Sequence, residues 1–370
     1  MFFHHSIYRN TLTLITVAIT SVLLVACGGS DDEDDEVVGV AEAVSQYAGP
    51  GSKWDVTLND DDTFEITRRP SLNEAIDLTV NGTYETLNSG FLLMTVTSAS
   101  GTDAPSAGDT ALALEAPGYA FFLKPLGEGG DQIISMVTAG ECPSADINAN
   151  WVMVKKSSDA NANDEGRDFF GTFNFSAGQG AAMLPSRYAL SNGFPDQGMQ
   201  ALSGGTCSDG IMEVEDAVMY LTSNGGAIVH TGVQEEDDAS FIFAIAQSEI
   251  SAIANLDGNY AGFLFDDNNA NGQKIELVSM SCASGDCTAQ LVEDAEAGTL
   301  SEESVTITLN GNPDGLGNGL ITGTIRNEGT GNLACMADTS VLSTNRKMIS
   351  CVGQSPGDQT KMFNVLFVSE

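Results

Sequence analysis

The sequence has few basic residues. Its 370 residues include 14 Lys and Arg against 51 Asp and Glu, so the formal net charge is -37 at pH 7. Binding to nucleic-acid phosphates needs clustered Lys and Arg, and an acidic excess of this size repels a polyanion. We therefore expect no nucleic-acid partner.

Histidine is also scarce, and several motifs are missing. Of three histidines, only His230 lies beyond the first ten residues. The chain contains no P-loop, no dinucleotide-binding glycine fingerprint, no H-E-x-x-H motif and no C-x-x-C pair. These absences exclude the nucleotide and zinc sites that the motifs mark. We expect His230 to lie at a strand end or on the surface rather than to act as a general base.

Patterns with helical spacing are few, whereas alternation of apolar and polar residues is common. Trp54 to Leu58 and Phe64 to Thr67 alternate on either side of the turn-rich Asn59 to Asp62, which predicts a β-hairpin. The same alternation recurs at Leu78 to Val80, Val305 to Leu309 and Ile321 to Ile325. Short apolar runs predict strands buried on both faces at Phe91 to Met94, Tyr119 to Leu123, Phe241 to Ile245 and Val365 to Val368.

The fold class and the domain limits follow from these patterns. Val37 to Tyr47 and Ala244 to Asn255 are the best helix candidates. At roughly 150 residues per domain, we predict a mainly β protein of two or three antiparallel sandwich- or barrel-like domains with few short helices. The predicted divisions are 1–26 for a signal peptide, 27–37 for a tether, 38–156 for a first β domain, 157–166 for a linker and 167–370 for a second β domain with a further split near 255.

The amino terminus carries an export pattern. Arg9 precedes an uncharged, largely apolar run from Thr11 to Ala26, which at 16 residues is shorter than the roughly 20 that a membrane span needs. Leu24-Val25-Ala26-Cys27 then resembles the lipobox of bacterial lipoproteins. The resemblance implies cleavage before Cys27, lipidation of its thiol, and anchoring to a membrane that the protein does not cross.

The residues after Cys27 refine this expectation. Gly28 in place of an aspartate resembles the outer-membrane sorting pattern of that family, which implies the periplasmic or the outer face of the outer membrane. Six consecutive acids from Asp31 to Glu36 repel one another, so we expect an extended, solvated tether rather than a calcium site there.

Six cysteines remain when Cys27 is set aside, an even number that suits disulfides in an exported chain. Six cysteines allow fifteen connectivities, and the sequence alone does not choose among them. The shortest loop closures join Cys282 to Cys287 and Cys335 to Cys351, which leaves Cys142 for Cys207.

One loop resembles a metal-binding pattern. Asp267, Asn269 and Asn271 occupy positions 1, 3 and 5 before Gly272, as in the first half of a calcium loop. The second half departs from the pattern, because position 12 is Val278 where the bidentate glutamate belongs. A turn rich in Asn and Gly also needs no metal. We expect no other cofactor.

Candidate catalytic groups fail on their chemistry. Ser355 lies in a G-x-S-x-G pattern, but Pro356 lacks the backbone N–H that the oxyanion hole requires, and no histidine follows. Glu213 and Glu215 form a pair of acids typical of glycosidases, yet on a strand they also define an ordinary solvated face. We therefore predict a non-enzymatic binding or structural module of the cell envelope with an unidentified protein or glycan ligand. A carboxylate-dependent hydrolase acting on carbohydrate and a calcium-stabilised surface adhesin are the alternatives.

Overall fold

The computed structural model describes residues 43–49, 54–70, 74–126, 133–138, 142–155, 169–176, 181–191, 193–196, 198, 206–214, 217–222, 227–231, 240–250, 252–266, 274–311, 318–338, 346–359 and 361–370. The predicted signal peptide, Cys27, the acidic tether and the linker at 157–166 lie outside these ranges. Within them the chain is almost entirely β, which confirms the predicted fold class.

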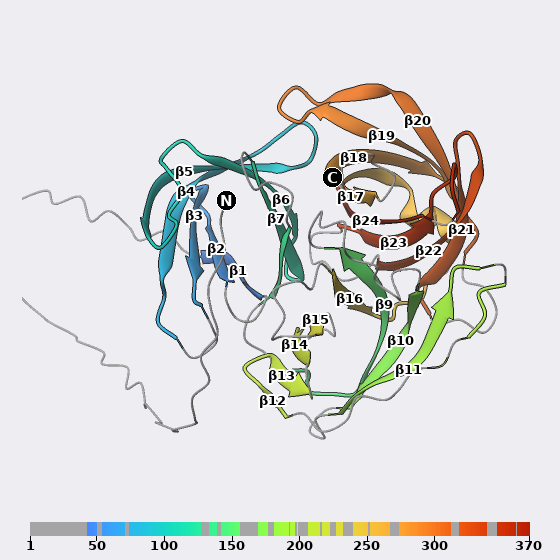
Figure 1. The fold of residues 1–370 in the computed structure, drawn as a ribbon, viewed down its shortest axis with the longest axis horizontal. Coiled ribbons are helices and arrows are strands. Elements are labelled where there is room, and N and C mark those ends of the chain that lie inside the picture. Colours follow the sequence, from blue (N-terminus) through green and yellow to red (C-terminus); the bar gives the residue numbers. More distant parts are fainter. Residues whose placement is uncertain are drawn as a thin grey trace, which may run out of the picture. The chain divides into compact units, whose positions relative to one another are not determined.

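The first eight strands form a closed antiparallel barrel (Figure 1). Its strands are β1 (Ala43–Gly49), β2 (Trp54–Asn59), β3 (Thr63–Arg68), β4 (Leu78–Thr86), β5 (Leu92–Gly101), β6 (Thr110–Ala116), β7 (Ala120–Pro125) and β8 (Ile134–Thr138). Each strand pairs with the next, and the barrel closes where Tyr47 and Ala48 of β1 pair with Thr138 and Val137 of β8. We call this the N-terminal barrel.

The next eight strands form one open antiparallel sheet. They are β9 (Ile147–Lys155), β10 (Phe169–Ser176), β11 (Ala181–Ala189), β12 (Cys207–Ser208), β13 (Ile211–Val214), β14 (Ala217–Leu221), β15 (Ala227–Thr231) and β16 (Ser240–Ala246). Their order is β11-β10-β9-β16-β15-β14-β13-β12, so the first and last strands of the segment, β9 and β16, pair with each other inside the sheet. The strands on either side of the predicted linker, β9 and β10, pair with each other.

The last eight strands form a second closed antiparallel barrel, the C-terminal barrel (Figure 1). They are β17 (Gly258–Asp266), β18 (Lys274–Ala283), β19 (Asp286–Asp294), β20 (Thr299–Leu309), β21 (Leu320–Arg326), β22 (Thr330–Asp338), β23 (Met348–Gln354) and β24 (Met362–Ser369). The barrel closes through β17 and β24, whose register runs from Tyr260 opposite Ser369 to Asp266 opposite Phe363.

The predicted hairpin is confirmed: β2 and β3 pair, with Val56 opposite Ile66. The strands predicted around residues 305–309, 321–325 and 365–368 are present as parts of β20, β21 and β24. The apolar run from Val365 to Val368 is buried at every position, as its lack of polar residues indicates.

Both helix predictions are wrong in the described residues. The last residues of the first candidate belong to strand β1. There Tyr47 pairs with Val56 and Thr138 and is buried where the barrel closes. The second contributes residues 244–246 to β16 and then only the single turn η1 (Ile253–Leu256), a 3-10 helix. In each case pairing within a sheet overrides a weak helical period. Across the described ranges no helix is long and apolar enough to cross a bilayer.

Three disulfides join the cysteines as the shortest loop closures suggest: Cys142 to Cys207, Cys282 to Cys287, and Cys335 to Cys351. The last two each join directly opposite residues, on β18 and β19 and on β22 and β23. The first closes a loop of 65 residues and ties the segment before β9 to β12, a strand of two residues at the sheet edge.

Candidate functional site

The C-terminal barrel contains a cavity of about 260 Å³. Its walls are apolar, with side chains from six of the eight strands: Leu264, Val278, Ala289, Val305, Ile307, Ile325, Phe363, Val365 and Phe367. An apolar cavity of this kind is the usual form of a small-molecule site when a few polar groups border it.

Glycine opposite phenylalanine helps to keep the lumen open. On β24, Phe367 lies directly opposite Gly262 and Phe363 directly opposite Gly353. A Cβ at Gly262 would lie 2.5 Å from the Phe367 ring, and one at Gly353 would lie 2.2 Å from the Phe363 ring. Each ring therefore packs against the backbone of the neighbouring strand, in space that a side chain there would occupy.

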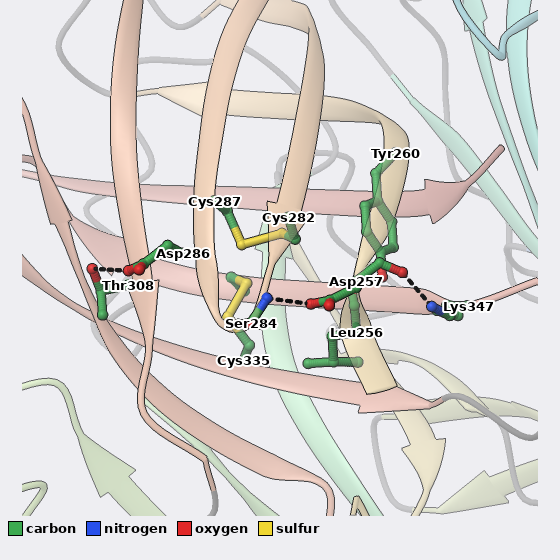
Figure 2. The surroundings of a disulfide bond; sticks show 11 residues. Leu256, Asp257, Tyr260, Cys282, Ser284, Asp286, Cys287, Thr308, Cys335 and Lys347 are labelled. Carbon is green, nitrogen blue, oxygen red and sulfur yellow. Dashed lines mark hydrogen bonds between the residues drawn. A yellow bond between two sulfur atoms is a disulfide. The ribbon is translucent and has the colours of Figure 1, made fainter. Parts of the chain in front are cut away.

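The turn η1 closes one end of the barrel. It directly precedes β17, and Leu256 is buried in the cluster of side chains inside the barrel. The Tyr260 hydroxyl donates to the Leu256 carbonyl at 2.6 Å. Burial raises the pKa of Tyr260, with a smaller contribution from Asp257, so this hydroxyl stays protonated as a donor. Lys347 Nζ donates to the Asp257 carbonyl, which fixes the turn further (Figure 2).

Two disulfides lie between this closed end and the cavity. Their four cysteines are buried in the same cluster as Leu256. Figure 2 labels three of them, Cys282, Cys287 and Cys335. By register, Cys287 is opposite Ile307 and Cys351 is opposite Val365, two residues that line the cavity. The disulfides thus cross-link strand pairs at the base of the site, where a covalent link limits changes in cavity shape.

The opposite end of the cavity is polar, and we call it the mouth. Asn327 and Glu328 in the β21–β22 loop and Ser355, Pro356 and Gly357 in the β23–β24 loop border it. Asn327 and Glu328 are exposed, whereas Ser355 is 4% exposed. A ligand in this cavity would have an apolar body in the lumen and its polar end at these loops.

The interior of the N-terminal barrel is packed differently. A cluster of buried aromatic and aliphatic side chains fills it, and the rings of Tyr47 and Phe121 stack at 5.4 Å. The Tyr47 hydroxyl donates to Glu115 Oε1 at 2.6 Å. Burial raises the pKa of Tyr47 strongly, and the Glu115 carboxylate raises it further, so the tyrosine is a neutral donor to the carboxylate.

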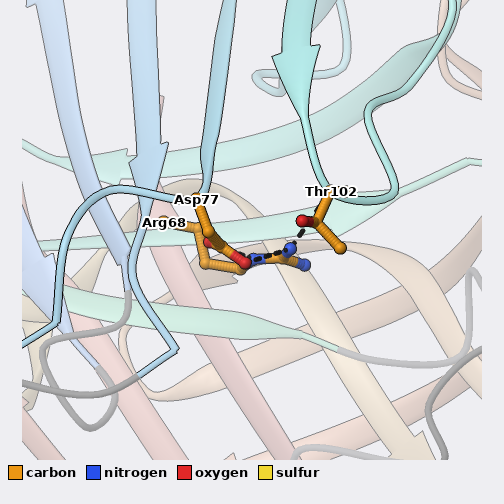
Figure 3. A network of polar contacts seen from close by, with 3 residues as sticks. All are labelled: Arg68, Asp77 and Thr102. Carbon is orange, nitrogen blue, oxygen red and sulfur yellow. Dashed lines mark hydrogen bonds and ion pairs between the residues drawn. The ribbon is translucent and has the colours of Figure 1, made fainter.

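An ion pair lies at the end of β3 in the N-terminal barrel (Figure 3). Arg68 Nε donates to Asp77 Oδ1 at 3.0 Å and Nη2 to Asp77 Oδ2 at 2.9 Å. The same Nη2 donates to the Thr102 carbonyl at 3.0 Å, and the guanidinium lies 5.7 Å from the Trp54 ring centre. These contacts tie the end of β3 to two connecting loops and to β2.

Replacing Arg68 by methionine is expected to lower the free energy of unfolding by about 2 kcal/mol, because Asp77 would lose its partner in a mostly buried position. Arg69→Met is the matched control, because it breaks the ion pair with Asp55. The Arg69 and Asp55 side chains are 30% and 38% exposed. We expect about 0.5 kcal/mol for the control. Urea denaturation measures both, and equal losses would contradict the role assigned to burial.

The candidate calcium residues Asp267, Asn269 and Asn271 lie outside the described residues. The strands that flank them, β17 and β18, pair up to Asp266 opposite Lys274. In the described part of the chain, no three His, Cys, Asp or Glu side chains gather as a metal site would require.

The groups considered for catalysis are not brought together. Ser355 borders the cavity, whereas His230 is on β15 and Glu213 on β13, both in the middle sheet. Glu215 lies outside the described residues. The sequence analysis did not predict the cavity, because its walls consist of ordinary core residues. The sequence feature that could have indicated it is the presence of small residues at lumen-facing positions: Ala289, Gly262 and Gly353.

Comparisons with known proteins identify no family. No family model matches the chain, and no curated protein matches it. Among solved structures, it is similar to a mutant of the vaccine antigen transferrin binding protein B (TbpB) from Haemophilus parasuis Hp5, with 11% identity and a TM-score of 0.29. The match covers 86% of this chain and 65% of the other. A TM-score this low does not establish a shared fold.

Proposed function

We propose that the protein is a non-enzymatic binding lipoprotein of the bacterial cell envelope, and that its C-terminal barrel holds a small, largely apolar ligand. The observation that carries the proposal is the cavity of about 260 Å³, with apolar walls, a closed base and a polar mouth. Pockets that bind small molecules share this combination of an apolar lining and a few polar groups.

The anchor and the location are part of the same proposal. The lipobox-like Leu24-Val25-Ala26-Cys27 supports lipidation at Cys27 and attachment to the outer membrane. The three disulfides support an oxidising compartment outside the cytoplasm. In this arrangement the acyl chains hold the protein at the membrane, while the barrel remains in the aqueous phase for its ligand.

Filling the cavity tests the binding function. We expect fluorobenzene, followed by ¹⁹F NMR titration, to bind the protein, because an apolar cavity of about 150 Å³ already holds benzene. Ala289→Leu adds three carbon atoms at a buried position that lines the cavity. We expect it to weaken fluorobenzene binding at least about tenfold without lowering the melting temperature, since the added atoms enter space that is already open.

Thr288→Leu is the matched control, because the adjacent residue of the same strand is exposed. It adds an apolar side chain of the same kind outside the barrel and should leave fluorobenzene binding unchanged. If fluorobenzene binds the Ala289→Leu variant as well as it binds the unchanged protein, the cavity is not the site.

A further inference from the structure

One charged side chain lines the cavity, whereas Arg326 and Lys361, at the ends of the same two loops, do not line it. Of the described residues that line it, Glu328 is the one with an ionisable side chain, and it lies exposed at the mouth. The whole chain carries a formal net charge of -37. A field of this sign raises the local concentration of cations and lowers that of anions, most strongly at low ionic strength.

The cavity also limits the size of its occupant. A cavity of about 150 Å³ holds benzene, which has six carbon atoms. Scaled to about 260 Å³, the barrel holds an apolar body of about ten non-hydrogen atoms. This is the size of a short alkyl chain or a single substituted ring, and it is too small for a membrane lipid.

A charged head group has to remain at the mouth. The walls are aliphatic and aromatic, and burying a charge among them without a partner would be strongly unfavourable. At the mouth the head group keeps its hydration and lies near the Glu328 carboxylate. That position attracts an ammonium group and repels a carboxylate.

We propose that the ligand of this site is a short cationic amphiphile, whose apolar body of about ten non-hydrogen atoms fills the lumen and whose ammonium group lies at the mouth beside Glu328. The inference rests on the proposed binding function and adds the size and charge of the ligand. A fatty carboxylate of the same length is the disfavoured counterpart.

Calorimetric titration of the full chain with octylammonium, 1-octanol and octanoate tests the charge preference. At about 0.01 M salt we expect octylammonium to bind about tenfold more tightly than octanoate, with 1-octanol between them. At about 0.5 M salt the ratio should shrink, because screening weakens both the attraction and the repulsion.

Two variants locate the source of the preference. Glu328→Gln should lower the ratio of octylammonium to octanoate affinity about threefold, since one exposed ion pair contributes roughly this factor. Asp358→Asn removes an exposed carboxylate from the β23–β24 loop that does not line the cavity, and it should leave the ratio unchanged within about twofold. An unchanged ratio in Glu328→Gln would overturn the assignment of the head group.

A series of alkylammonium ions tests the size. Affinity should rise about fourfold per methylene, the equivalent of about 0.8 kcal/mol, and stop rising near decylammonium. In Ala289→Leu the rise should stop about three carbons earlier. Continued gain up to hexadecylammonium would overturn the size limit. Octanoate binding as tightly as octylammonium while fluorobenzene still binds would overturn the charge preference alone; binding of none of these probes would overturn the proposed function.

Discussion

Replacement of Cys27 by serine is expected to abolish labelling of the protein by radioactive palmitate and to leave the precursor uncleaved. The thiol sulfur is the atom that the lipobox resemblance makes the acceptor of the diacylglyceryl group, and a serine hydroxyl is a far weaker nucleophile. Lipidation precedes cleavage in that family, so both steps should fail together. The measurement is palmitate incorporation together with the electrophoretic mobility of the product.

The membrane association should change in parallel. One acyl chain binds a bilayer only marginally, while two or more anchor a protein stably. We therefore expect the unchanged protein in the membrane fraction. A Cys27→Ser variant from which the signal segment has also been removed by truncation should be largely lost from that fraction. The Cys142→Ser/Cys207→Ser variant is the control, because these thiols form a disulfide in the folded protein. Palmitate incorporated into Cys27→Ser would refute the lipid anchor.

Several strands were predictable from the sequence because the pattern that marks them is local. Alternation at Trp54 to Leu58 and an unbroken apolar run at Val365 to Val368 each report which faces of a strand are buried, and the structure agrees at both. The closure of the strands into barrels is a different matter. Tyr47 pairs with Thr138, and Tyr260 pairs with Ser369, across long stretches of chain that no short pattern connects.

The cavity was unpredictable for a related reason. The cavity is lined by residues typical of any packed core, such as Val278, Val305 and Ile307. Only the register of the strands around the closed barrel places these side chains around the same cavity. Ser355 illustrates the difference between a motif and a site: as a catalytic elbow it fails because Pro356 follows, yet it borders the cavity from the β23–β24 loop. Its position comes from the turn that joins the last two strands.

The second large effect is expected from the disulfide between Cys142 and Cys207. Replacing both cysteines by alanine should lower the free energy of unfolding by about 4 kcal/mol, because the bond closes a loop of 65 residues and the unfolded chain gains the corresponding freedom. Strand pairing compensates little for the loss of the disulfide, since β12 pairs with β13 only at Cys207 and Ser208. Urea denaturation of the oxidised variant and of the unchanged protein measures the difference.

The other two disulfides provide the scale for this prediction. The Cys335–Cys351 bond closes a loop of 16 residues and the Cys282–Cys287 bond a loop of 5, for which loop entropy gives about 3 and about 2 kcal/mol. Alanine at both members of each pair should therefore destabilise the protein in the order of loop length. If the Cys282–Cys287 pair were the most costly to remove, packing of its buried sulfurs in the barrel lumen would outweigh chain entropy. The base of the ligand cavity would then be held in place mainly by the packing of that disulfide.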